Sequence, residues 1–186
     1  MTSPLQLILL IGFIALFSYF LGAGARTFGH DETDVNGAFW AQFSFIFTGA
    51  VGAMLLGYRQ ELHPWNAAAA AVLLACSLLL YEWARRTVRE RGFQIAWSGR
   101  VPDSVCEAGP YARVRHPVYA SYLLAFLAMP VAFPRLAMLA IFLFNAALFI
   151  HGARSDERSL AQSPLKDEYA AYRRRAGMFF PRLRRT

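Results

Sequence analysis

The chain has 186 residues, of which 56% are hydrophobic, with a mean hydropathy of +0.32 and a formal net charge of +7. This length allows one domain, and the apolar content is typical of a membrane protein rather than a soluble one. The positive charge alone would suit nucleic acid, but the long apolar segments argue against that partner. Cys76 and Cys106 have no metal-ligand spacing, so neither a structural zinc nor another metal is expected.

Three apolar segments occupy the first half of the chain, at Leu5–Leu21, Ala38–Tyr58 and Asn66–Trp83. Each approaches or reaches the length that a helix needs to cross a bilayer, so we predict three transmembrane helices. The first is not read as a signal peptide, because no basic residue precedes it and its apolar run is too long. The third is predicted to continue as a helix to Arg91, since no helix breaker occurs before Gly92.

Two further apolar runs follow in the second half, Val118–Phe133 and Leu136–His151, and each has 16 residues. A helix of that length covers only about 24 Å, which is less than the hydrocarbon core of about 30 Å. We therefore predict a short helical hairpin that packs against the three earlier spans. Asn145 lies in the middle of the second run and should face protein rather than lipid.

The chain after residue 152 is polar and is predicted to form two short helices. The first should begin near Asp156, and the second should start at Ser163 and Pro164, a capping residue followed by a first-turn proline. Tyr169 and Tyr172 are three residues apart and should share the inner face of that second helix.

Basic residues are distributed unevenly between the two sides that five spans would create. One side would carry 17 Lys and Arg residues and the other only two, Arg59 and Arg135. The positive-inside rule then places the amino terminus outside, and the site and carboxy terminus in the cytoplasm. Basic residues beside apolar spans, and the end formed by Phe179–Pro181 and arginines, suit anionic lipid headgroups. The bilayer is thus an expected partner, whereas the sequence does not indicate an oligomeric state.

A polar motif precedes the fourth apolar run, with the sequence Gly-Pro-Tyr-Ala-Arg-Val-Arg-His-Pro-Val-Tyr from Gly109 to Tyr119. Charged groups beside hydrocarbon are costly and are usually functional. The motif resembles the one shared by isoprenylcysteine carboxyl methyltransferases and phospholipid methyltransferases, integral-membrane enzymes that use S-adenosylmethionine. The family's downstream acidic pair, leucine and two tyrosines are matched over about the last hundred residues by Asp156, Glu157, Leu160, Tyr169 and Tyr172.

The match is not complete. The family's usual Glu-Glu pair is Asp156–Glu157 in this chain, and its small glycine after the motif is replaced by Ser121. Its Phe-Gly before the tyrosines is replaced by Pro164–Lys166, and the spacing from Glu157 to Tyr169 is one residue longer. The placement of the tail over a cofactor is therefore less well defined than the motif itself.

The resemblance implies an all-α polytopic membrane protein with five transmembrane helices, a short helical hairpin and a cytoplasmic carboxy-terminal helical tail. It implies one domain over residues 1–186, with three spans in 1–83 and a cofactor-binding catalytic half in 84–186. S-adenosylmethionine is the expected cofactor, and the acceptor is expected to be lipophilic and to arrive from the bilayer. The expected cofactor-binding residues are Tyr111, His116, Pro117, Tyr119, Asp156 and Glu157, and the expected catalytic residues are Arg115, Arg154 and Glu157.

The acceptor and two rival functions stay open at this point. Arginines around the motif outnumber acids, which favours a carboxylate acceptor such as isoprenylcysteine, whereas an amine would need Glu157 or Asp156 as a general base. A phospholipid amine and a small thiol are the alternatives. An NADPH-dependent reductase of the sterol-reductase type is disfavoured, because those enzymes have Asn-Tyr after Arg-His rather than Pro-x-Tyr. A non-enzymatic membrane component or transporter is disfavoured by the lack of charge inside the first three spans, where a transporter would place coupling groups.

Overall fold

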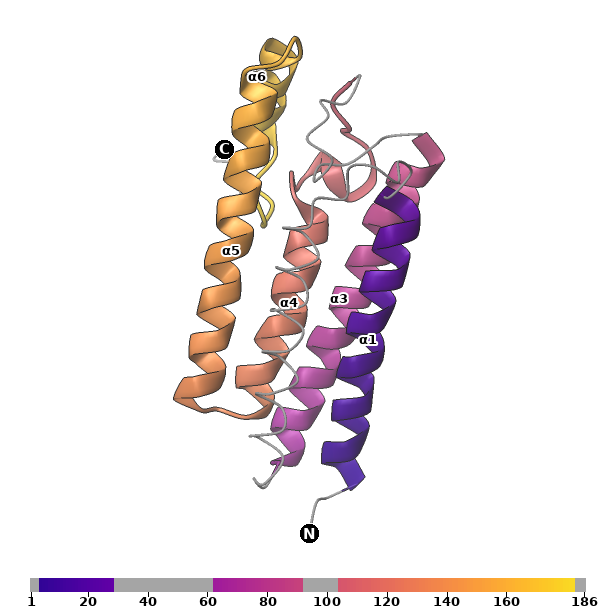
Figure 1. The fold of residues 1–186 in the computed structure, drawn as a ribbon, viewed down its shortest axis with the longest axis vertical. Coiled ribbons are helices and arrows are strands. Elements are labelled where there is room, and N and C mark those ends of the chain that lie inside the picture. The colour runs from indigo at the N-terminus through magenta and orange to yellow at the C-terminus, as the bar shows by residue number, and fades with distance from the viewer. Residues whose placement is uncertain (1–3, 29–61, 92–103, 183–186) are drawn as a thin grey trace.

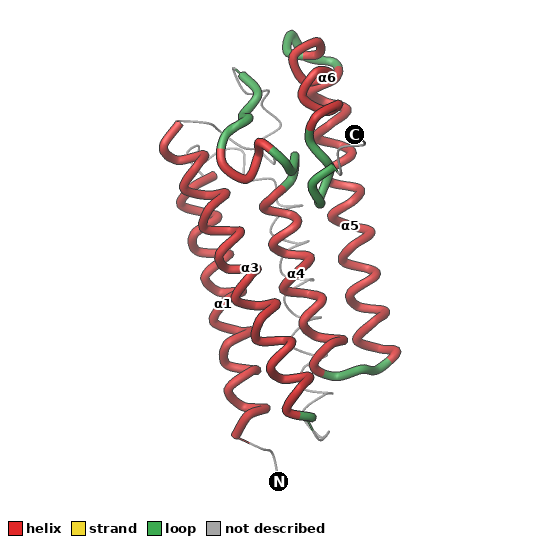
Figure 2. Tube along the Cα trace, turned by 180° about the vertical axis from the view of Figure 1, so that it is seen from behind, coloured by secondary structure: helices red, strands yellow, loops and turns green. Residues whose placement is uncertain are grey.

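The computed structural model describes residues 4–28, 62–91 and 104–182, and these residues form an all-helical bundle (Figure 1). The elements in chain order are α1 (Pro4–Phe28), α3 (Pro64–Arg91), the 3-10 turn η1 (Gly109–Ala112), α4 (Pro117–Ala132), α5 (Leu136–Ala161) and α6 (Lys166–Arg175). Helices α1, α3, α4 and α5 run along one axis, and η1 and α6 lie at the end opposite the amino terminus (Figures 1 and 2). The predicted all-α class is confirmed for the described residues.

Two described helices are long and apolar enough to cross a membrane, Pro64–Arg89 and Leu136–Ala161. Only 28% and 22% of the residues in their most apolar stretches are buried inside the protein. Shorter apolar helices cover Pro4–Phe20 and Pro117–Ala132. The structure therefore supports membrane association. The predicted span Ala38–Tyr58 lies outside the described residues, and the five-span arrangement stays a prediction.

The seam between α3 and α4 is made of small side chains and hydrogen-bonded serines. Ser77 Oγ donates to the carbonyl oxygen of Ser121 at 2.6 Å, and Ser121 Oγ donates to that of Val118 at 2.6 Å. Both serines are fully buried. Small residues let two helices approach closely, and each hydroxyl here is satisfied by a backbone carbonyl. This seam fixes the start of α4, where the polar motif ends, against α3, which runs to Arg91 as predicted.

Aromatic rings attach α1 to the same seam. The Phe17 ring lies 5.0 Å from that of Phe126 in an edge-to-face arrangement, and Phe20 lies 4.5 Å from Tyr81. The Tyr81 hydroxyl donates to the carbonyl oxygen of Phe20 at 3.2 Å. Aromatic pairs of this kind stabilise by more than the area they bury, so α1 is firmly joined to both α3 and α4.

Helix α5 differs from the prediction. A run ending at His151 and a separate helix near Asp156 were expected, but α5 is continuous over 26 residues to Ala161. At about 39 Å it is long enough to cross the hydrocarbon core. The prediction was wrong because a change from apolar to polar side chains does not interrupt a helix. Six of the ten residues from 152 to 161 are Ala, Arg, Glu or Leu, which favour a helix. Asn145 is buried as predicted, and its Nδ2 donates to the carbonyl oxygen of Ile141 at 2.8 Å.

The start of α6 also differs. Ser163 and Pro164 were expected to open the helix, but it begins at Lys166. The two residues instead lie in the turn after α5, where Ser163 Oγ accepts a hydrogen bond from the Leu165 amide at 3.1 Å. The serine closes the turn, and this local bond competes with its use as a helix cap.

Candidate active site

The polar motif is presented by a tight turn followed directly by a helix. Gly109 has a positive φ of 53°, and a side chain there would overlap with Thr87 of α3, so glycine lets η1 pack closely on α3. Pro117 is the first residue of α4 and His116 is its N-cap residue. Proline suits this first turn because its fixed φ matches the helix and its missing N–H is not needed. The turn therefore holds the motif at the amino-terminal end of α4.

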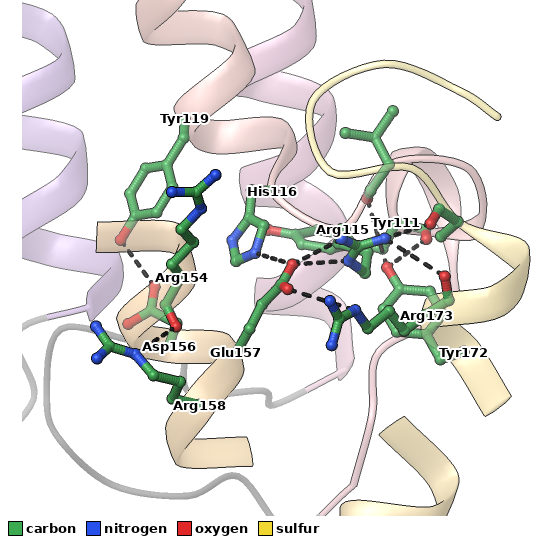
Figure 3. Close-up of polar contacts among 12 residues, drawn as sticks. Tyr111, Arg115, His116, Tyr119, Arg154, Asp156, Glu157, Arg158, Tyr172 and Arg173 are labelled. Atoms are coloured by element: carbon green, nitrogen blue, oxygen red, sulfur yellow. Dashed lines mark hydrogen bonds and ion pairs between the residues drawn. The ribbon is translucent and has the colours of Figure 1, made fainter. Parts of the chain in front are cut away.

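Arg115 and Glu157 form a buried ion pair at the centre of the site (Figure 3). Arg115 Nε and Nη2 each lie 2.8 Å from Glu157 Oε1, and the two side chains are only 6% and 7% exposed. Arg115 Nη1 donates to the carbonyl oxygens of Ala176 and, at 3.5 Å, Arg173. Two charges removed from water need such complete pairing to be tolerated. The pair joins the motif to α5 and to the carboxy-terminal tail.

His116, Tyr119 and Asp156 lie beside this pair (Figure 3). His116 Nε2 is 3.3 Å from Glu157 Oε1, and the Tyr119 hydroxyl donates to Asp156 Oδ2 at 3.0 Å. The His116 and Tyr119 rings are nearly parallel, with an interplanar angle of 6° and centroids 5.5 Å apart. The first turn of α4 thus binds both members of the acidic pair, each through a different side chain.

The tail after α6 returns to the motif and pairs with its backbone. Val114 and Gly177 form a parallel β-bridge. The Arg115 amide donates to the Gly177 carbonyl at 2.8 Å, the His116 amide to the Met178 carbonyl at 3.0 Å, and the Gly177 amide to the Arg113 carbonyl at 3.0 Å. These bonds satisfy backbone groups of a segment that has no regular structure of its own. They also fix the backbone of Arg115 and His116, the two motif residues that contact Glu157.

Helix α6 contributes side chains to the same place. The Tyr172 hydroxyl donates to the carbonyl oxygen of Tyr111 at 2.6 Å, and Arg173 Nε lies 3.7 Å from Glu157 Oε2. Tyr169 and Tyr172 are both buried with rings 6.1 Å apart, which confirms the predicted shared inner face. Burial raises the pKa of the Tyr169 phenol, and the nearby charge of Glu157 raises it further. Tyr169 is therefore neutral at physiological pH.

Most of the predicted site residues come together, but not all. The residues in mutual contact are Arg115, His116, Tyr119, Asp156 and Glu157. Pro117 starts the helix that carries Tyr119, and Tyr111 supplies a carbonyl while its buried hydroxyl has no hydrogen-bond partner among the described residues. Arg154 is exposed and forms no ion pair within the described part of the chain. The roles given to these residues remain predictions.

Sequence reasoning missed the contributions of Arg173 and the tail. The sequence analysis gave Arg173 no place in the site, yet Arg173 Nε lies near Glu157 Oε2. A signal existed, because Arg173 follows Tyr169 by four residues and so lies on the same inner face of the helix. The carbonyl of Ala176 and the ring of Phe179, 6.1 Å from that of His116, had no comparable signal.

The two acids differ in how much of their charge is already neutralised. Glu157 is buried and is shared by Arg115, His116 and Arg173. Asp156 is partly exposed and binds Tyr119 through Oδ2, while its other oxygen makes no hydrogen bond within the residues that the structure covers. Asp156 is therefore the better partner for a cationic ligand, and Glu157 is better suited to hold the site together.

No family model matches the chain. The chain is 30% identical to the cobalt-zinc-cadmium resistance protein CzcN of Cupriavidus metallidurans over 139 residues. The aligned region covers 74% of this chain and 61% of CzcN. It is 32% identical to a methanethiol S-methyltransferase of a Pseudomonas species over 93 residues. This second aligned region covers 49% of this chain and 35% of that enzyme. The chain thus aligns with about three fifths and one third of the lengths of these relatives. The second similarity supports a methyltransferase.

Proposed function

We propose that the protein is an integral-membrane methyltransferase that uses S-adenosylmethionine. The main support is that the motif contacts the acidic pair. Arg115 and His116 bind Glu157, and Tyr119 binds Asp156. These are the two sequence motifs that resemble the membrane methyltransferases, and they are some forty residues apart in the chain. The distant similarity to an S-methyltransferase supports the same reaction class.

The residues present fit the groups that this cofactor carries. When bound, S-adenosylmethionine supplies a methyl group on a positively charged sulfonium. Asp156 has a carboxylate oxygen for the ammonium of the methionine part, and charge-assisted hydrogen bonds of this kind are strong. The stacked faces of His116 and Tyr119 suit a neighbouring cation. The buried Arg115–Glu157 pair positions these groups, because methyl transfer depends mainly on alignment and exclusion of water.

A lipophilic thiol is the acceptor that we favour. The expected carboxylate acceptor relied on free arginines, but Arg115 is fully engaged by Glu157 and by backbone carbonyls. The similar Pseudomonas enzyme is named for a thiol acceptor. A carboxylate of the isoprenylcysteine kind is the second candidate, because exposed Arg154 lies two residues before Asp156. A phospholipid amine is the third.

Binding and turnover together test the proposal. S-adenosylhomocysteine should bind the purified protein and NADPH should not, and Asp156→Asn should weaken binding by roughly tenfold or more through one lost charge-assisted bond of about 1.5–3 kcal/mol. Arg175→Gln, an exposed change, is the matched control. Binding of NADPH alone would contradict the methyltransferase assignment.

The acceptor is tested with labelled cofactor and a long-chain thiol, a farnesylated cysteine and phosphatidylethanolamine offered side by side. A thiol reacts as its thiolate, so its rate should rise with pH toward the thiol pKa of about 8.5. A carboxylate is already ionised at pH 7, so its methylation should change little over that range. Methylation of the farnesylated cysteine alone would reverse the choice of acceptor and leave the reaction class standing.

We also propose that the site end of the bundle faces the cytoplasm, as the distribution of basic residues predicts. In a chain with Cys76 and Cys106 replaced by alanine, cysteines placed at exposed Lys166 and exposed Arg135 report on opposite ends of the bundle. An impermeant thiol reagent should label only Arg135→Cys in intact cells, and both variants after lysis. Labelling of Lys166→Cys from outside would reverse the orientation.

A further inference from the structure

The tail after α6 has two adjacent phenylalanines that differ sharply in exposure. Phe179 is half-buried, packs against the core and lies 6.1 Å from the His116 ring, whereas Phe180 is 76% exposed. We call residues 176–182 the tail hook, because this segment leaves α6, pairs with the motif and then turns back beside α5 (Figure 1). The exposed Phe180 ring, held in a turn of defined shape, suggests contact with a partner.

The tail hook is held in shape by bonds at both ends. Its start is fixed by the β-bridge of Gly177 with Val114. A side chain at Gly177 would overlap with the carbonyl oxygen of Phe180, so the turn closes tightly on itself. Its end is fixed by Arg182, whose Nη1 donates to the carbonyl oxygen of Arg174 at 3.0 Å. The backbone bridge before Phe180 and the Arg182 side-chain bond after it therefore hold in place a turn whose Phe180 is exposed.

The exposed charge around Phe180 is positive. Arg174 and Arg182 are both exposed, and neither forms an ion pair with a described acid. Of the acids nearby, Glu107 binds Arg175 at 2.7 Å and Glu157 binds Arg115. The tail hook thus offers one apolar ring and two uncompensated guanidinium groups to the same partner.

We propose that the tail hook docks onto anionic phospholipid at the membrane surface. The Phe180 ring enters the boundary between headgroups and acyl chains, and Arg174 and Arg182 bind lipid phosphates. The exposed apolar side chains of α3 and α5 suit hydrocarbon beside the bundle, and Trp83 is exposed two turns before the end of α3 at Arg91. Because Phe179 and Met178 belong to the same turn and contact His116, the lipid contact also holds the tail against the site.

The test uses the full-length protein in lipid nanodiscs made with phosphatidylcholine, with or without phosphatidylglycerol. An environment-sensitive NBD fluorophore is attached to Phe180→Cys in a chain with Cys76 and Cys106 replaced by alanine. Its emission should shift to the blue and be quenched by nitroxide-labelled lipid, and both effects should increase with phosphatidylglycerol content. The salt dependence should be strong, because the contact is electrostatic at the surface.

Variants then separate this contact from general basicity. Arg174→Gln and Arg182→Gln should each raise the phosphatidylglycerol content needed for half-maximal insertion about fivefold, which corresponds to about 1 kcal/mol for each arginine. Arg175→Gln is the matched control, because Arg175 is exposed on the same helix but already binds Glu107. On unlabelled protein, Phe180→Ser should retain less phosphatidylglycerol in native mass spectrometry. A fluorophore that stays in water in every membrane, or equal losses in the Arg175→Gln control, would overturn the proposal.

Discussion

Replacing Glu157 by glutamine is expected to destabilise the protein by about 3–5 kcal/mol, because it leaves the Arg115 guanidinium buried without a counter-charge. Arg115 would keep its bonds to the carbonyl oxygens of Ala176 and Arg173, but these carry only partial charge. His116 and Arg173 would lose the same carboxylate. The measurement is equilibrium unfolding in detergent micelles, followed by circular dichroism.

Two controls separate burial of charge from loss of a contact. Glu107→Gln removes an exposed ion pair with Arg175, and surface pairs contribute only about 0–1 kcal/mol. The double variant Arg115→Met and Glu157→Leu removes both buried charges, so it should be less destabilised than Glu157→Gln alone. If Glu157→Gln were no worse than Glu107→Gln, the buried pair would not stabilise the fold in the way the structure implies.

Those parts of the fold that depend on local pattern were predictable from sequence. The apolar runs predicted α1, α3 and α4, and the run Val118–Phe133 differs from the bounds of α4 by only one residue at each end. Helix length was underestimated for α5, because hydrophobicity was used to decide where a helix ends. The backbone responds instead to breakers and propensity, and the residues after His151 continue the helix. The end of an apolar run indicates where a helix leaves the hydrocarbon, not where the helix itself ends.

The site was predictable only as far as sequence motifs reach. Two motifs that resemble one family were expected to meet, and Arg115, His116 and Tyr119 do contact the acidic pair on α5. The contacts from Arg173, Ala176 and Gly177 depend on how the tail returns to the motif. A parallel bridge between Val114 and Gly177, which are 63 positions apart, has no local signal, so only the structure shows it.

Gly177→Ala is expected to release the tail from the site and to destabilise the protein by about 2–3 kcal/mol. The added methyl group would overlap with the Phe180 carbonyl oxygen and would lie 3.2 Å from the Arg182 amide nitrogen. Both atoms are backbone, so no side chain can move aside and the turn itself must open. Opening it breaks the three backbone hydrogen bonds to Arg113, Arg115 and His116, each of which contributes about 1 kcal/mol.

Gly12→Ala is the matched control for Gly177→Ala, because Gly12 lies in α1 with nothing within 4 Å of an added methyl group. Alanine favours a helix over glycine by about 0.5–1 kcal/mol, so this variant should be neutral or slightly more stable. Thermal unfolding in detergent compares the two, and limited trypsin digestion reports on the tail directly. Cleavage after the arginines at 173–175 should become much faster in Gly177→Ala only. Equal digestion of both variants would show that the bridge at Gly177 does not hold the tail against the motif.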